Sequence, residues 1–248
     1  MRYNDRTIES VSQVLAALRQ QVKPKQQVWF RGHSRWNWKL VPGLARTQVN
    51  LRAEHALIKR FMQNAMPLLP TPPRDEWAWM FLMQHHRAST RLLDWSESPL
   101  AALYFAVQDP EHMAAIGTVW CLDALALNRE ANLKFEFELE IPAAGSDGVL
   151  DSYLPSRVQE SPSELSPLAI IGPRNTARMA AQLGCFTINH RRHTPIEAIE
   201  NGQHVWRWKI PARAKTKILR ELALLGYTGL TLFPELDRVA DLSKELLR

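Results

Sequence analysis

The chain has 248 residues, of which 46% are hydrophobic and 23% are charged, an ordinary balance for a globular protein. This length is enough for one large domain or two small ones with a buried core. The formal net charge of +6 favours polyanionic partners such as nucleic acid or a phosphate-bearing cofactor, although a surplus that serves only solubility explains it equally well. The basic residues do not form one long run, which argues against a simple nucleic-acid-binding tail.

Two features favour a cytoplasmic protein. The first ten residues, MRYNDRTIES, lack the apolar stretch of a signal peptide, and no apolar run approaches the roughly 18 residues that span a bilayer, so we expect no membrane association. Cys121 and Cys185 are the only cysteines, and each lies in an apolar stretch. They are predicted to be buried free thiols, which suits a reducing compartment.

Apolar spacing and turn residues predict the elements of the first half of the chain. Helical spacing appears where apolar residues recur every three to four positions. Asp75 and Ser98 are suited to begin helices as N-caps, and Pro99 suits a first helical turn. In chain order we expect a helix at 8–20, a buried strand at 28–30, a loop or hairpin at 34–42, helices at 51–66 and 75–86, an extended segment at 90–95, a buried helix after Ser98 and a strand at 118–122.

The second half is predicted in the same way. A strand with one solvent-exposed face is expected at 135–141, where Glu136, Glu138 and Glu140 alternate with apolar residues. The remaining elements are a long connection or insertion at 142–168, a helix at 175–183, a strand at 185–189, a charged loop at 190–203, a strand at 205–210, a helix at 214–225 closed by Gly226, a strand at 230–233 and a helix at 236–247. No internal repeat or domain boundary is visible. The expected fold is therefore one α+β domain over 1–248, a mixed core of short strands flanked by helices.

Two segments combine polar groups with buried apolar surroundings. Arg31 ends the apolar strand Trp29-Phe30 and precedes Gly32. An arginine there needs a partner, which is either a phosphate of a ligand or a core carboxylate such as Asp94. The stretch 84–99, QHHRASTRLLDWSESP, then places many polar side chains directly before a strongly apolar helix. Its adjacent histidines cannot share one helix face, so we expect no metal site.

These segments resemble the FRG-domain family. The resemblance rests on WFRGHS at 29–34, on Gln84-His85 followed by TRLLDW at 90–95, and on Ser98-Pro99 with the ALYFA helix at 102–106. The helix with Gln182 and Gly184 and the closing GLTLFPEL also fit, so that the resemblance covers about 25–240. Family members tend to carry Tyr-Gly after Gln-His, whereas this chain has His86-Arg87. Since the family is mostly bacterial and often lies near phage-defence genes, the resemblance implies a toxin or antiviral defence role.

The chain is also similar to ADP-ribosyltransferases of the Arg-Ser-Glu type. These enzymes place an arginine on a first strand and a Ser-Thr-Ser strand before a helix with an Ala-x-x-Phe-Ala pattern, and here Leu93-Asp94-Trp95-Ser96 leads into 102–106 with similar spacing. The chain departs from the pattern because Asp94-Trp95 replace the first Ser-Thr. The similarity implies an ADP-ribosyltransferase-like fold, NAD as substrate, Arg31 on its pyrophosphate or ribose, and Ser96 steadying the contacts of the first strand. We expect His85, Arg91 and Trp95 to contact the cofactor.

Such chemistry needs a carboxylate, because positive charge develops on the ribose when the nicotinamide bond breaks. Glu235, after the last predicted strand, is our first choice, and Asp94 belongs to the same proposed centre. Glu138 and Glu140 form the alternative, but a solvated strand face explains that pair as well. A charge at the start of the last helix likewise explains Glu235.

Arg174, Arg178 and Gln182 recur every four residues and would share one helix face. They are candidates for binding the phosphates of an RNA or DNA acceptor, while a solvated basic face is the simpler explanation. No phosphate-binding glycine-rich loop and no Gly-x-Ser-x-Gly elbow occurs. Three alternatives to the transferase therefore stay open: a non-catalytic nucleic-acid or nucleotide-binding module, a metal-independent nuclease or hydrolase that uses His85 or His86 with Asp94, and a structural partner. A toxic enzyme would also need an inhibitory partner protein.

Overall fold

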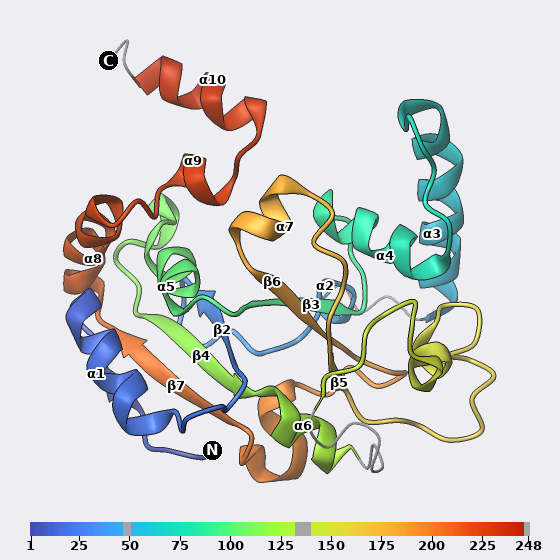
Figure 1. Ribbon diagram of the computed structural model, residues 1–248, viewed down its shortest axis with the longest axis horizontal. Helices are drawn as coiled ribbons and strands as arrows, with labels where there is room; N and C mark the ends of the chain where they lie inside the picture. The colour runs from blue at the N-terminus through green and yellow to red at the C-terminus, as the bar shows by residue number, and fades with distance from the viewer. Residues whose placement is uncertain (47–50, 132–139, 246–248) are drawn as a thin grey trace.

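The computed structural model describes residues 1–46, 51–131 and 140–245 (Figure 1). Its centre is a seven-stranded sheet in the order β1-β7-β4-β2-β3-β6-β5. Only β1 and β7 run parallel, and the other neighbours are antiparallel. The strands are β1 (Arg6–Thr7), β2 (Val28–His33), β3 (Leu92–Ser96), β4 (Gly117–Asp123), β5 (Leu168–Ile170), β6 (Gly184–Ile188) and β7 (Val205–Ile210). The expected mixed core of short strands flanked by helices is confirmed.

Ten α-helices occur in the part of the chain that the structure describes, together with short 3-10 turns. The α-helices are α1 (Val11–Gln21), α2 (Gly43–Arg46), α3 (Leu51–Ala65), α4 (Glu76–His85), α5 (Pro99–Val107), α6 (Ala124–Glu130), α7 (Ala177–Ala181), α8 (Ala212–Leu224), α9 (Gly229–Leu232) and α10 (Leu236–Glu245). The 3-10 turns are η1 (Met66–Leu68), η2 (Pro110–His112), η4 (Gly148–Tyr153) and η5 (Ile196–Gly202). The predicted caps are confirmed, since Asp75 accepts a hydrogen bond from the backbone of Ala78 and Ser98 accepts one from Ala101.

Helices cover both faces of the sheet. On one face α1, α5 and α8 lie together against β2, β4 and β7 (Figure 1), and their apolar side chains form one core cluster with Trp206 and Trp208. On the other face Trp29, Trp95 and Trp120 pack with residues of α6 and η5. A third cluster joins α4 to β5 and β6. Burying these side chains is the main force that holds the layers together.

Gly32 allows α5 to lie directly on β2. A Cβ at this position would meet the backbone oxygen of Ala102 at 1.9 Å and the backbone nitrogen of Ala106 at 2.7 Å. Glycine is therefore required here because a helix backbone, rather than a ligand, approaches it. This contact fixes the position of β2 immediately beside Arg31.

Two expected elements differ in the structure. The segment predicted as a strand at 230–233 is the helical turn α9, because the side chain of Thr228 accepts a hydrogen bond from the backbone of Thr231, and the Thr231 hydroxyl accepts one from Thr228. The helix predicted at 175–183 is only α7, so Arg174 precedes it. The predicted strand at 135–141 falls largely outside the described residues, and Glu140 and Ile141 are not in a strand. The segment 142–168 is a long connection that contains η4, as expected.

The cysteine prediction is confirmed, because Cys121 and Cys185 are free and buried. Burial raises the pKa of both thiols well above its ordinary value. No helix among the described residues is long and apolar enough to cross a membrane. Whether 1–248 folds as a single unit stays a prediction.

Replacing Gly32 by alanine is expected to lower the free energy of unfolding by about 3 kcal/mol, at the upper end of the usual overpacking range, because α5 cannot keep its place on β2. Urea denaturation of purified protein measures the loss. Gly148→Ala is the matched control, since nothing lies within 4 Å of a Cβ there. Equal stability of the two variants would contradict the close contact between β2 and α5.

Candidate functional site

The sheet nearly divides between β2 and β3, and a pocket lined by charged residues opens there. These strands pair at one register position, Phe30 opposite Ser96, whereas β2 pairs with β4 at six positions. A cavity of about 350 Å³ is lined by residues of both strands, a size within the usual range for small-molecule sites. The near-division brings Arg31 and Asp94, 63 positions apart in the sequence, to the same cavity.

Arg31 spans the gap between the two strands. Its Nη1 donates a hydrogen bond to the backbone oxygen of Asp94 and lies 3.8 Å from the Asp94 carboxylate oxygen Oδ2. Its Nε donates to Nε2 of His33 at 2.9 Å. Burial lowers the pKa of the Arg31 guanidinium to about 10, against the opposing effect of Asp94. Arg31 therefore keeps its charge at neutral pH in a largely desolvated place, which suits the recognition of an anion.

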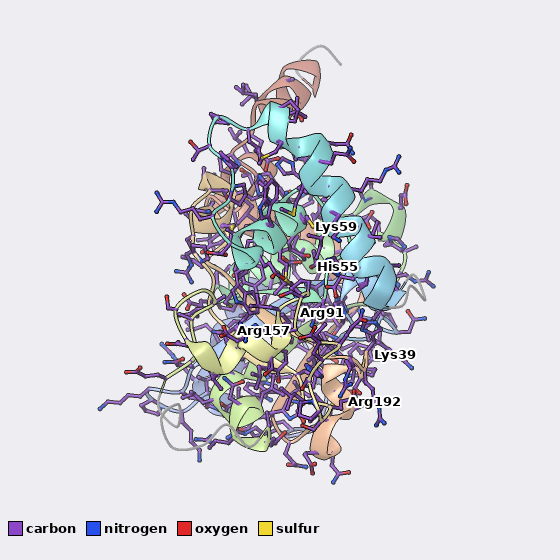
Figure 2. All side chains as sticks on the ribbon, turned by 90° about the vertical axis from the view of Figure 1, so that its right-hand side faces the viewer. Lys39, His55, Lys59, Arg91, Arg157 and Arg192 are labelled. Atoms are coloured by element: carbon purple, nitrogen blue, oxygen red, sulfur yellow. The ribbon has the colours of Figure 1, made fainter. Side chains whose placement is uncertain are left out.

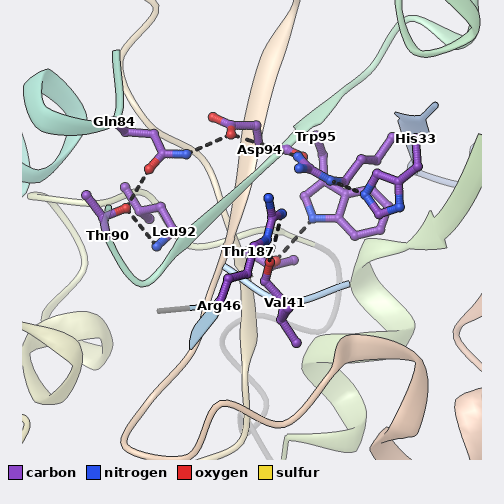
Figure 3. Close-up of polar contacts among 10 residues, drawn as sticks. His33, Val41, Arg46, Gln84, Thr90, Leu92, Asp94, Trp95 and Thr187 are labelled. Atoms are coloured by element: carbon purple, nitrogen blue, oxygen red, sulfur yellow. Dashed lines mark hydrogen bonds and ion pairs between the residues drawn. The ribbon is translucent and has the colours of Figure 1, made fainter. Parts of the chain in front are cut away.

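Asp94 is open to a ligand. Its side chain is 54% exposed, and its Oδ2 accepts a hydrogen bond from Nε2 of Gln84 at 2.7 Å. The Gln84 side-chain oxygen in turn accepts a hydrogen bond from the Thr90 hydroxyl at 2.6 Å (Figure 3). Gln84 of α4 thereby fixes the orientation of the Asp94 carboxylate. The position of Arg31 at the end of an apolar strand suggested a buried carboxylate as its partner, but Asp94 is exposed. Removing Arg31 therefore leaves no buried carboxylate without a partner.

Ser96 and Trp95 are more deeply buried than Asp94. The Ser96 hydroxyl donates to the backbone oxygen of Gln182 at 2.6 Å and accepts from the backbone nitrogen of Ser98 at 2.9 Å. It therefore ties the end of β3 to the end of α7 and to the start of α5. Trp95 is buried, and its Nε1 donates to Thr187 at 3.1 Å (Figure 3). Both residues line the cavity.

Glu235 lies at the rim. Its Oε1 is 3.7 Å from Nη1 of Arg178, and Arg178 also stacks over the ring of Phe233 with its Cζ 4.8 Å from the ring centroid. Arg178 and His85 line both the main cavity and the neighbouring hollow that contains Glu235. Burial lowers the pKa of His85, and the nearby His86 and Arg178 add to this effect.

Arg91 is placed away from the cavity. It is completely buried, its Nε is 2.7 Å from the Glu54 carboxylate, and it donates to the backbone oxygens of Asn189 and Tyr153. The expected cofactor contact of Arg91 is therefore not seen. Removing one partner of a buried ion pair costs about 3–5 kcal/mol. Arg91, which is labelled in Figure 2, therefore ties α3 to the segment that leads into β3.

The expected common face of Arg174, Arg178 and Gln182 does not form, because α7 begins only at Ala177. Arg174 pairs instead with Glu97 at 2.5 Å. Arg178 and Gln182 both line the cavity, and Nε2 of Gln182 donates to the backbone oxygen of Leu232 at 2.9 Å. Of the alternative glutamates, Glu138 lies outside the described residues, and Glu140 is exposed and does not line this cavity.

Several residues that line the cavity were not predicted from the sequence. Trp38 is 41% exposed at the cavity although most tryptophans are buried, and it packs edge-on against His33. Arg46 at the end of α2 and Asp109 at the start of η2 also line the cavity. Asp109 also lies with Glu111 and His112 in a group whose ligand atoms are within 4.8 Å of one another. The pair of tryptophans at 36 and 38 is the sequence signal that could have indicated this side of the cavity.

His33 should make the folded protein sensitive to acid. Burial, with help from Arg31 and Arg46, lowers the pKa of His33 well below 6.5. As the pH falls below 6.5 the unfolded chain binds a proton that the folded chain excludes, so stability is lost. His33→Gln keeps an acceptor for Arg31 and should lose about 1 kcal/mol less stability than the wild type between pH 7 and pH 5.5. Urea denaturation at both pH values measures this, and equal losses would show that His33 titrates normally.

Part of the chain matches a known protein family. Residues 26–115 match the family model of the FRG domain, which includes β2, β3, α5 and therefore both strands of the cavity. The C-terminal segments that also resembled the family, with Gln182 and Glu235, lie beyond the matched residues. A search of curated proteins and a search of solved structures found no match. The matched residues include the Phe-Arg-Gly at 30–32, which lies where β2 and β3 separate.

Proposed function

We propose that the chain is an NAD-dependent ADP-ribosyltransferase with an ADP-ribosyltransferase-like fold. In this proposal its acceptor is a nucleic acid, and its biological role is that of a toxin or antiviral defence effector. The observation that supports this most is the position of Arg31. It lies in a cavity between two neighbouring strands, opposite Asp94 and beside Ser96. The similarity to Arg-Ser-Glu transferases requires this arrangement of an arginine strand beside a serine strand that leads into a helix.

The charges of the cavity suit a dinucleotide. Arg31 and Arg46 lie on one side and interact electrostatically, which suits a pyrophosphate. Trp38 and Phe105 line the same cavity and offer flat apolar surfaces for a nicotinamide or adenine ring. The fixed hydrogen bonds of Asp94 and Ser96 mean that little reorganisation is needed when a ligand enters.

In the proposed reaction the bond between ribose C1′ and the nicotinamide nitrogen breaks, and its electron pair leaves with the nicotinamide. Because Asp94 lines the cavity opposite Arg31 and Glu235 does not line it, we assign to the Asp94 carboxylate, rather than to Glu235, the stabilisation of the positive charge that develops on the ribose. The acceptor then donates a lone pair to C1′, and its proton passes to the carboxylate of Glu235 at the rim. Arg31 holds the pyrophosphate, and Ser96 keeps β3 in register with α7.

The nuclease alternative has less support. It requires a histidine that contacts Asp94, but the side chain that contacts Asp94 from α4 is Gln84. Among the described residues the structure records no hydrogen bond between His85 or His86 and this carboxylate. A non-catalytic binding module remains the main competing function.

Labelled NAD tests the proposal. Wild-type protein incubated with NAD and with RNA, DNA or cell lysate is expected to transfer label to nucleic acid, and Arg31→Ala is expected to reduce transfer roughly 100-fold or more, as removal of a charge-stabilising donor does. The variant should stay folded because Asp94 is exposed. Arg220→Ala, an exposed arginine on α8, is the control and should retain activity. If folded wild-type protein consumes no NAD with any acceptor, the transferase proposal is wrong and a binding module is favoured.

A further inference from the structure

A second hollow adjoins the Arg31 cavity and has a different character. It has a volume of about 580 Å³ and contains His86, Arg87, Glu235 and Asp237, and it shares His85 and Arg178 with the main cavity. A ligand in one cavity therefore lies close to a ligand in the other. The hollow is built from the end of α4, from Arg178 of α7 and from 235–237 at the start of α10.

Arg87 holds a conformation that favours glycine. Its φ is +61°, in the left-handed region where a side chain other than glycine is strained. The side chain is exposed and makes no hydrogen bond or ion pair with the residues that the structure describes. The N–H donors of the Arg87 guanidinium are therefore available to a ligand in the hollow.

Arg178 is only loosely paired, although it is half-buried. An arginine has five N–H donors, and here the recorded partners are the backbone oxygen of His85 at 3.4 Å and the carboxylate of Glu235 at 3.7 Å. Both distances are long for charge-assisted hydrogen bonds. Arg87 lies near enough to lower the pKa of Arg178, although burial is the larger cause.

Acceptors lie beside these donors. Oε1 of Glu235 is buried and receives no hydrogen bond of normal length from the described residues, and Asp237 lines the same hollow. Two guanidinium groups and two carboxylates balance in formal charge. A phosphate would be repelled by the carboxylates, whereas a neutral ring with acceptors on one edge and donors on the next can pair with both kinds of group.

Guanine has this pattern. Its N7 and O6 accept hydrogen bonds, for which an arginine is the usual partner, while its N1 and N2 groups donate. An unstacked base of a single strand presents these edges to a protein and can also stack on an arginine plane. We propose that the hollow binds a guanine base of a single-stranded nucleic acid, with Arg87 and Arg178 on N7 and O6 and Glu235 on N1 and N2. Its role as the acceptor site rests on the proposed transferase function, but the binding itself does not.

Fluorescence anisotropy without NAD tests the binding. The probes are labelled eight-residue thymidine strands with or without one central guanine. The guanine strand is expected to bind about 10-fold more tightly, within the range of one well-placed pair of base contacts. Replacing guanine by 7-deazaguanine, which lacks the N7 acceptor, or by hypoxanthine, which lacks the N2 amino group, should remove most of this preference.

Substitutions in the protein provide a second test of guanine binding. Arg87→Gly should abolish the preference and yet raise the melting temperature by about 2–4 °C, because glycine relieves the left-handed strain. Glu235→Gln should weaken the preference, and Arg220→Ala should leave it intact. Equal binding of both strands by the wild type would overturn the inference and indicate phosphate contacts only. A preference that persists in Arg87→Gly would overturn it as well, because the guanine would then be recognised at another place.

The two proposals can fail separately. Guanine preference without NAD turnover would keep this inference and reject the transferase. NAD turnover with an acceptor that lacks guanine, together with equal binding of the two strands, would keep the transferase and reject this inference.

Discussion

The site depends on one side chain that crosses the gap between β2 and β3. These strands share a single register pair, Phe30 with Ser96, and beyond it Arg31 reaches from β2 to the backbone and carboxylate of Asp94 on β3. A continuous ladder would fill this space with backbone hydrogen bonds and leave no cavity. Because Arg31 connects the two strands with a charge rather than a ladder, it can exchange part of its pairing for a ligand.

The surrounding structure holds this gap open by rigid contacts on both sides. On the β2 side, Gly32 lets the backbone of α5 press on the strand. On the β3 side, the buried pair of Arg91 and Glu54 and the hydrogen bonds of Ser96 fix the strand against α3 and α7. Basic side chains thus occur in two settings, Arg91 as one half of a buried ion pair and Arg31 at the edge of a cavity.

Much of the fold could be predicted from the sequence, because apolar periodicity and capping residues are local signals. Asp75 and Ser98 begin their helices as predicted. The turn α9 was wrongly predicted as a strand because Leu230, Leu232 and Phe233 fit a short apolar run, and only the capping of Thr228 by Thr231 reveals the helix. The role of Arg91 could not be predicted either, since its partner Glu54 lies 37 residues away and spacing does not report burial. Trp38 at the cavity is likewise a product of tertiary packing.

The most direct test of the site is the affinity of the protein for ADP-ribose, measured by calorimetry for the wild type and for Arg31→Lys. A lysine keeps the positive charge but loses the planar fork that can bind two oxygens at once. We expect the variant to unfold at nearly the wild-type temperature and to bind at least roughly 10-fold more weakly, the equivalent of about 1.4 kcal/mol. Unchanged affinity in Arg31→Lys, or no binding by the wild type, would contradict the role of Arg31 as the anion-binding centre of the cavity.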